Sequence, residues 1–203
     1  MNKKIIFLDW DGTICWSRFW ESLIKSDVVF AQAVNKFFLY EKEIVHNWMR
    51  GKIKSEQINV IISRKTGLSR AKVWREFVSN CEKMKIDKDI ISLVKKVRKK
   101  HPVILVTGNM DCFTRFTVPA LKLNEIFDDI VNSADIGYLK TDYDGRVFID
   151  LLEKFDIDNI SNAYLLDDSE KTCKIFNQLG GTAIKINSKK DTINHLKIFC
   201  NKN

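Results

Sequence analysis

The sequence predicts an α/β protein, a doubly wound parallel sheet into which a small all-helical unit is inserted. Five short apolar runs, which predict strands, alternate with helical patterns along the chain. The first two runs lie more than ninety residues apart, whereas a complete unit of strand, helix and strand needs only about thirty residues. The surplus between them indicates an inserted domain.

The predicted strands are short and continuously apolar, which is typical of strands buried on both faces of a sheet. Turn or helix-start signals follow each of them. They lie at 5–8, 103–106, 130–131, 163–166 and 182–186, and the later ones alternate with helices at 111–123, 145–155 and 169–179. Gly180 and Gly181 are expected to end the last of these helices.

The inserted unit spans residues 17–84 and carries helical patterns without a convincing alternating strand. Its helical runs fall at 19–49, 55–65 and 69–82. Ser55 and Ser69 are candidate N-caps of the last two runs. We expect this unit to lie over the carboxyl ends of the strands, and residues 1–16 and 85–203 to form a Rossmann-like core.

The composition indicates an ordinary globular protein, because 45% of the 203 residues are hydrophobic and 30% are charged, which excludes disorder as the default. No apolar stretch approaches the roughly 18 residues that span a bilayer, and no signal peptide is recognisable. A cytoplasmic protein without a membrane partner is therefore expected. The five cysteines have no close pair, which predicts reduced structural thiols.

The net charge of +8 raises the possibility of a nucleic-acid partner. The surplus is diffuse, and its densest block, residues 95–100, lies on a predicted helix. In that helix Ile90, Ile91, Val94 and Val97 form a buried stripe, which favours a solvated basic face. We expect no nucleic-acid partner, because a basic surface would also steer a phosphorylated small molecule to its site.

Two acidic pairs follow predicted strands directly. Asp9 and Asp11 end the first strand, where Gly12 invites a turn, and Asp167 and Asp168 end the fourth. Like charges so close together are unfavourable unless a cation or hydrogen-bond donors compensate them. Hard divalent cations prefer oxygen ligands, and ligands of such sheets bind at the carboxyl ends of the strands. The two pairs therefore predict a site for Mg²⁺.

Two further segments could hold an anion. Thr107, Gly108 and Asn109 follow the second strand, where a hydroxyl and backbone amides can bind a phosphate. Lys140 lies in the loop after the third strand and could neutralise both a carboxylate and a phosphoryl oxygen. Taken singly, an ordinary turn or helix cap and a solvent-exposed lysine are the commoner explanations of these residues.

The acidic pairs, the segment at 107–109 and Lys140, taken in their order along the chain, resemble the four motifs of the haloacid dehalogenase superfamily. The matching residues are Asp9, Trp10, Asp11, Gly12 and Thr13, then Thr107, Gly108 and Asn109, then Lys140, then Asp167 and Asp168. The resemblance covers about residues 1–16 and 85–190. The helical insert is similar to the cap that members of this superfamily carry after the first motif.

The resemblance implies a phosphatase in which Asp9 is the nucleophile and forms an aspartyl-phosphate. Asp11 would protonate the leaving alcohol and then deprotonate the attacking water. Mg²⁺ would be held by Asp9, the backbone carbonyl of Asp11 and Asp168, with Asp167 a direct or water-mediated partner.

The transferring phosphoryl group would be held by Thr107 and the amides of Gly108 and Asn109, with Lys140 screening it from the nucleophile. Two positions depart from the superfamily pattern. Thr141 stands where a proline commonly follows the lysine, and Thr172 stands where some members carry a further acid.

The expected function is a magnesium-dependent phosphatase that hydrolyses a small phosphorylated metabolite. Two alternatives stay open, a phosphomutase of sugar phosphates on the same site and a catalytically silent binding protein of this fold. Dehalogenation is disfavoured, because members that act on carbon–halogen bonds lack an acid at the position of Asp11.

Several residues could recognise the rest of the substrate through stacking or charge. They are Trp16, Arg18, Trp20, Trp48 and Arg50 in the first part of the insert, and Phe113 and Arg115 after the second strand. Packing is the commoner role of tryptophans within helices, which weighs against Trp20 and Trp48. The three histidines, His46, His101 and His195, show no partner spacing and are expected to be ordinary.

Overall fold

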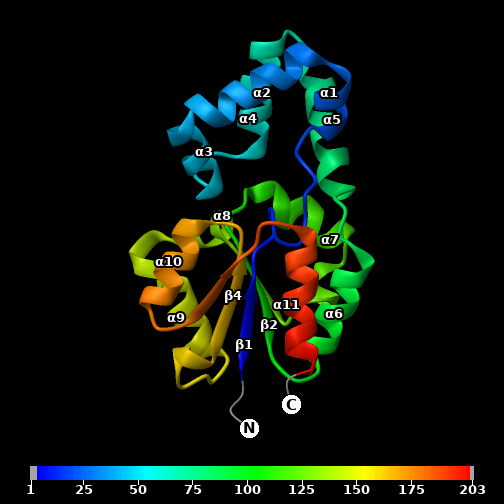
Figure 1. Cartoon of the computed structure of the whole chain (residues 1–203). Coiled ribbons are helices and arrows are strands. Elements are labelled where there is room, and N and C mark those ends of the chain that lie inside the picture. The colour runs from blue at the N-terminus through cyan, green and yellow to red at the C-terminus, as the bar shows by residue number, and fades with distance from the viewer. Residues whose placement is uncertain (1–3, 202–203) are drawn as a thin grey trace.

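The computed structural model describes residues 4–201 and contains a five-stranded sheet with helices on both faces (Figure 1). The strands are β1 (Ile5–Leu8), β2 (Val103–Thr107), β3 (Asp129–Asn132), β4 (Ala163–Asp167) and β5 (Thr182–Lys185). Their order is β3-β2-β1-β4-β5, and every neighbouring pair is parallel. This confirms the predicted α/β core of Rossmann type.

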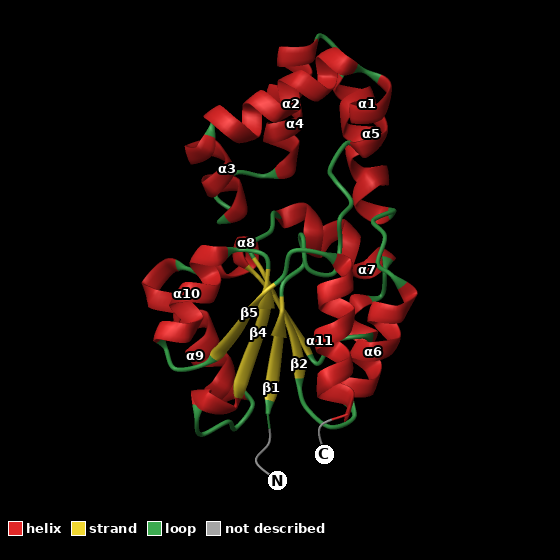
Figure 2. Ribbon diagram, viewed as in Figure 1, coloured by secondary structure: helices red, strands yellow, loops and turns green. Residues whose placement is uncertain are grey.

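The two faces of the sheet are covered by different helices (Figure 2). Ile6 and Leu8 of β1 belong to a hydrophobic cluster with α6 and α11, whereas Ile5 and Phe7 belong to one with α9 and α10. This alternation follows from the period of two along a strand. The core helices are α6 (Lys88–Arg98), α7 (Val118–Ala120), α8 (Ser133–Ile136), α9 (Arg146–Lys154), α10 (Glu170–Gln178) and α11 (Lys189–Asn201).

The cap, which we define as helices α1 to α5, stands over the carboxyl ends of the strands (Figure 1). Its helices are α1 (Glu21–Ser26), α2 (Val28–Tyr40), α3 (Lys42–Met49), α4 (Ser55–Thr66) and α5 (Arg70–Glu82). It has its own core, in which the rings of Trp20 and Phe77 lie 4.8 Å apart and those of Trp48 and Phe77 6.1 Å apart. The insert is helical as predicted, and its boundaries at 17 and 84 stay a prediction.

The run at 19–49 is not one helix but three. Asp27 ends α1 and caps α2, because its side chain accepts from the Phe30 N–H, and Glu41 separates α2 from α3. Ser69 caps α5 as predicted. The prediction for Ser55 was wrong, because Lys54 is the N-cap of α4 and Ser55 is its first residue.

The predicted helix at 111–123 is irregular. A π-helical turn at Phe113–Thr117 precedes the short α7, and a 3₁₀ turn follows at Leu123–Glu125. Pro119 explains the break, because it has no N–H to donate to the carbonyl four residues earlier. The carboxyl-terminal helix α11 was not predicted from the sequence.

Three expectations from composition can be compared with the structure. None of the helices within residues 4–201 has the length and apolar character to cross a membrane. In α6 the buried residues are Ile90, Leu93, Val94 and Val97, so that Leu93 takes the place expected for Ile91. The cysteines are all free, and four of the five are buried.

Candidate active site

The carboxyl ends of β1 and β4 bring three carboxylates together. Leu8 pairs with Leu166 across the parallel strands, and the Asp9 N–H donates to the Leu166 carbonyl at 3.0 Å. One carboxylate oxygen each of Asp9, Asp167 and Asp168 lies within 4.8 Å of the others. The two acidic pairs of the sequence therefore meet where the order of the sheet reverses, the usual ligand position in such folds.

Gly12 allows the loop after β1 to pass close to Asp168. Its φ of +66° lies in the left-handed region, and a Cβ at this position would lie 2.8 Å from Asp168 Cγ. Both the conformation and the close approach favour glycine. The turn signal at Gly12 in the sequence therefore has a second purpose, since it leaves room for the Asp168 carboxylate.

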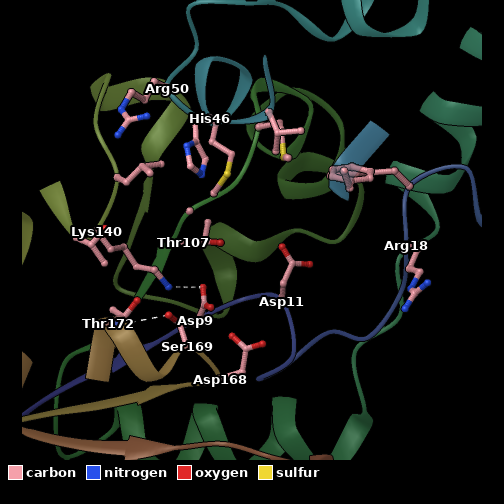
Figure 3. A pocket seen from close by; sticks show the side chains of 18 of the residues that line it. Asp9, Asp11, Arg18, His46, Arg50, Thr107, Lys140, Asp168, Ser169 and Thr172 are labelled. Atoms are coloured by element: carbon pink, nitrogen blue, oxygen red, sulfur yellow. Dashed lines mark hydrogen bonds and ion pairs between the residues drawn. The ribbon is translucent and has the colours of Figure 1, made fainter. Parts of the chain in front are cut away.

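Lys140 joins two of the carboxylates, and Figure 3 shows its ion pair with Asp9. Its Nζ lies 2.8 Å from Asp9 Oδ1 and 2.6 Å from Asp167 Oδ2, and all three side chains are buried. The second oxygen of Asp167 accepts from the Ser169 N–H at 2.8 Å. Both oxygens of Asp167 are thus engaged, whereas Asp168 is exposed.

The site carries more negative charge than Lys140 compensates. Burial raises the pKa of Asp9 to about 8, because it outweighs the opposing attraction of Lys140, and Asp167 adds to the rise. Partial desolvation and the charge of the neighbouring Asp167 also raise the pKa of Asp168 above its ordinary value, although its side chain stays accessible to solvent. A divalent cation would relieve this repulsion, and three carboxylates with an accessible oxygen on Asp168 suit the oxygen preference of Mg²⁺.

Thr107 ends β2 beside these groups and lines the same cavity. Its hydroxyl oxygen is buried and has no hydrogen-bond partner among the residues that the structure describes. Buried hydroxyls without a partner are uncommon in folded proteins. An oxygen of a bound ligand would provide the missing partner for Thr107.

Asn109 differs from the expectation, because its backbone N–H donates to Asn132 Oδ1 at 3.2 Å instead of facing the cavity. Its side-chain Nδ2 donates to Asp11 Oδ2 at 3.1 Å and so orients that carboxylate. Asn132 was missed from the sequence, since only the parallel register of Thr107 with Asn132 brings it there.

Asp11 lines the cavity, where its side chain is exposed to the solvent that fills it. Desolvation by the surrounding protein atoms still raises the pKa of Asp11 to about 7, with the charge of Asp168 adding to the rise and that of Lys140 opposing it. A carboxyl group with such a pKa can both release and take up a proton near neutral pH. Asp11 therefore suits a general acid and base.

A cavity of about 760 Å³ separates the cap from these carboxylates. Arg18, His46 and Arg50 line it from the cap side, and Figure 3 shows the His46 side chain pointing from α3 toward the cavity. His46 was expected to be ordinary, and a lone histidine offered no signal of this position. Thr141 and Thr172 also line the cavity.

The other candidates for substrate recognition lie elsewhere. Trp20 and Trp48 are fully buried in the core of the cap. Trp16 lines a separate surface hollow beside Lys85 and Lys189. Phe113 is buried against Trp10, with ring centroids 5.0 Å apart, and Arg115 pairs with Glu56 and Asp111.

Solved structures of known proteins share this fold. A solved HAD family enzyme from Bacteroides thetaiotaomicron is 19% identical with a TM-score of 0.73, and the match covers 91% of this chain and 94% of that chain. An HAD-like family hydrolase from Porphyromonas gingivalis is 14% identical with a TM-score of 0.75, and the match covers 100% of both chains. A dehalogenase solved as an intermediate complex is 12% identical with a TM-score of 0.68, over 100% of this chain and 99% of that chain.

These identities are low, so the solved structures support the fold alone. Among curated protein sequences no match was found. The model of the family described as haloacid dehalogenase-like hydrolase, in contrast, matches residues 3–180, which is most of the chain. The chain therefore belongs to the haloacid dehalogenase-like hydrolase family.

Proposed function

We propose that this hydrolase is a magnesium-dependent phosphatase that acts on a small phosphorylated metabolite through an aspartyl-phosphate. The observation that carries the proposal is that Asp9 lines one cavity together with two groups suited to a phosphoryl oxygen. Lys140 Nζ lies 2.8 Å from Asp9 Oδ1, and the Thr107 hydroxyl is buried without a partner in the described part of the chain. Both can stabilise the charge of a phosphoryl group in transfer.

In the first step a carboxylate oxygen of Asp9 attacks phosphorus and the bond from phosphorus to the ester oxygen breaks. Asp11 gives its proton to the departing alcohol oxygen. In the second step a water molecule attacks phosphorus, and its proton passes to Asp11. The bond to Asp9 then breaks, so that inorganic phosphate leaves and both carboxyl groups return to their starting states.

The remaining residues hold the reacting groups. Thr107, the Gly108 amide and Lys140 would bind the phosphoryl oxygens, and Asn109 would orient Asp11 through the hydrogen bond of 3.1 Å. Mg²⁺, held by Asp9, the backbone carbonyl of Asp11 and Asp168, would supply positive charge that draws electrons from the phosphoryl group. Asp167 would act as an indirect partner, because Lys140 and Ser169 engage both its oxygens.

Some structural relatives support a phosphatase, and others are dehalogenases. The enzyme from Bacteroides thetaiotaomicron was also solved in complex with magnesium and inorganic phosphate, at 20% identity to this chain. Some neighbours are dehalogenases, but a departing halide needs no proton. Asp11, with its pKa near 7, is suited to the alcohol of a phosphate ester and favours a phosphatase.

A screen of phosphorylated metabolites with and without Mg²⁺ tests this proposal, with Asp9→Asn as the blank. We expect release of inorganic phosphate that requires Mg²⁺ and is absent in the blank. Isomerised sugar phosphate without phosphate release would show a phosphomutase instead. A lack of any turnover, together with melting that Mg²⁺ does not change, would favour a catalytically silent binding protein.

A further inference from the structure

The cavity between the cap and the core has two unlike halves. The carboxylates that line it within the described residues, on Asp9, Asp11, Asp142 and Asp168, all come from the core. The half that faces them is mostly apolar. Its apolar side chains are Phe19, Ile24, Val34, Phe38, Val45 and Met49.

The helices of the cap place these side chains on one wall. Val34 and Phe38 lie one turn apart on α2, and Val45 and Met49 lie one turn apart on α3, so each pair faces the same way. All four also pack in the hydrophobic core of the cap. The wall is therefore backed by packed side chains, and it suits a fixed apolar ligand surface.

The cations that reach the cavity leave little for a second phosphate group. Arg50 donates from Nε and Nη2 to both oxygens of Asp142, at 2.8 to 3.0 Å. Lys140 is engaged by Asp9 and Asp167. Arg18 and Lys171 also line the cavity but are exposed to solvent. A bisphosphate would thus lack a buried, unpaired cation for its second group.

Hydrogen-bonding groups are also sparse on the cap wall. On α2 and α3 only Asn35 and His46 offer polar side chains to the cavity among the described residues. A polyhydroxy substrate would leave several hydroxyls without partners against the apolar wall. Each such hydroxyl lowers affinity by roughly tenfold.

We propose that the substrate is a phosphate monoester of an alcohol with a mostly apolar body, rather than a sugar phosphate or a bisphosphate. This inference rests on the proposed phosphatase activity and adds the substrate class. The phosphoryl group lies against Lys140 and Thr107, and the apolar body lies against Val34, Phe38 and Val45. One or two polar groups of the body can be met by Asn35 and His46.

A matched pair of substrates tests the inference, n-hexyl phosphate and glucitol 6-phosphate, which have the same carbon chain and differ in hydroxyl groups. We expect kcat/KM to be at least about tenfold higher for n-hexyl phosphate, and to rise on the order of threefold per methylene from ethyl to hexyl phosphate. The hydroxyls make glucitol the better leaving alcohol, so a preference for the hexyl ester reports binding of its body.

Two variants on neighbouring positions of α2 localise the effect. Phe38→Ala should lower kcat/KM for n-hexyl phosphate by roughly tenfold and for ethyl phosphate by much less. Leu39→Ala is the matched control, because Leu39 is 57% exposed and does not line the cavity. Equal effects of Phe38→Ala on both esters would contradict the assignment of this wall.

A kcat/KM for glucitol 6-phosphate that equals or exceeds the value for n-hexyl phosphate would overturn the proposed substrate class and leave the phosphatase proposal intact. If neither these esters nor any compound of the metabolite screen released phosphate, the phosphatase proposal would fail instead. Calorimetry with Mg²⁺ then tests the cavity separately, using methylphosphonate and n-hexylphosphonate. Binding at least about tenfold tighter for the hexyl compound supports the apolar wall, and equal affinities contradict it.

Discussion

Arg50 at the end of α3 and Asp142, 92 positions later, form a bidentate ion pair that joins the cap to the loop carrying Lys140. Asp142 also accepts from the Leu139 N–H at 2.9 Å, which fixes the loop on the other side of Lys140. The side chains are only 23% and 25% exposed. The ion pair therefore couples the position of the cap to the position of Lys140.

A double-mutant cycle with Arg50→Ala and Asp142→Asn should give a coupling free energy of about 0.5–1 kcal/mol in urea unfolding. Bidentate geometry and partial burial account for a value near the upper end of that range. The exposed pair of Arg146 and Asp150, at 61% and 43%, is the matched control and should give a smaller coupling. A coupling no larger than that of the control would contradict a role in holding the cap.

Asp111 ties the segment after β2 to the cap. Its Oδ1 accepts from Trp48 Nε1 at 3.0 Å and from Ser55 Oγ at 2.6 Å, and its Oδ2 accepts from Arg115 Nη1 at 2.7 Å. Burial alone would raise the pKa of Asp111, but these hydrogen bonds outweigh it and hold the pKa below its ordinary value. The ionised carboxylate is therefore favoured in the folded state.

The stability of the protein should depend on pH through this group. Because the folded-state pKa is lowered, Asp111 stabilises the fold above its ordinary pKa of 3.8, and this contribution is lost as the pH falls below that value. Asp111→Asn should lower the unfolding free energy by about 2–4 kcal/mol at neutral pH. As the pH falls below the ordinary pKa of Asp111, the unfolding free energy of the variant should decrease less than that of the wild type. Urea unfolding at several pH values measures both, with the exposed Asp135→Asn as control. If the unfolding free energies of wild type and Asp111→Asn depended on acid pH in the same way, Asp111 would not be the source of this pH dependence.

Thr107 should separate stability from activity. Thr107→Val removes a buried hydroxyl that has no partner among residues 4–201, so the unfolding free energy should stay the same or rise by up to about 1 kcal/mol. Turnover should fall by about 10²-fold, because a donor to the phosphoryl group is lost. Thr107→Ser keeps the hydroxyl and should keep most of the activity. A destabilised Thr107→Val enzyme with normal turnover would refute this assignment.

Asp168 should decide the affinity for Mg²⁺. Mg²⁺ should raise the melting temperature of the wild type, because a cation that binds only the folded state stabilises it. Asp168→Asn should need at least about tenfold more Mg²⁺ for the same rise. The control is Glu170→Gln, since Glu170 is exposed and pairs with Lys185 outside the site. The same Mg²⁺ dependence in Asp168→Asn and wild type would remove Asp168 from the metal site.

The sequence predicted the parts of the fold and the site that have local signals. The strands are apolar runs, and one acidic pair follows β1 while the other begins with the last residue of β4, so the parallel sheet had to bring them to one edge. The resemblance to the family then ordered Thr107 and Lys140 around Asp9. These features can be predicted from short segments of sequence, without knowledge of tertiary contacts.

The contacts that the sequence did not reveal are long-range and lack a spacing rule. Asn109 meets Asn132 across 23 positions, and Ser55 meets Asp111 across 56 positions, so that Ser55 orients a carboxylate instead of capping its helix. His46 faces the cavity only because α3 is folded back over the core. The helical pattern at 111–123 also did not predict the irregular helix there. Pro119 lacks an N–H for a regular helical hydrogen bond, and a π-helical turn at Phe113–Thr117 precedes it.

The covalent step on Asp9 is tested most directly by acid quenching during turnover with Mg²⁺ and p-nitrophenyl phosphate, whose phenolate departs without a proton from Asp11. Asp11→Asn should be used, because loss of the general base then slows only the attack of water and lets the aspartyl-phosphate accumulate. Mass spectrometry of the peptide that contains Asp9 should then show one added phosphoryl group, and the double variant with Asp9→Asn should show none. Phosphate release by Asp9→Asn at the wild-type rate, without any phosphorylated peptide, would contradict the account.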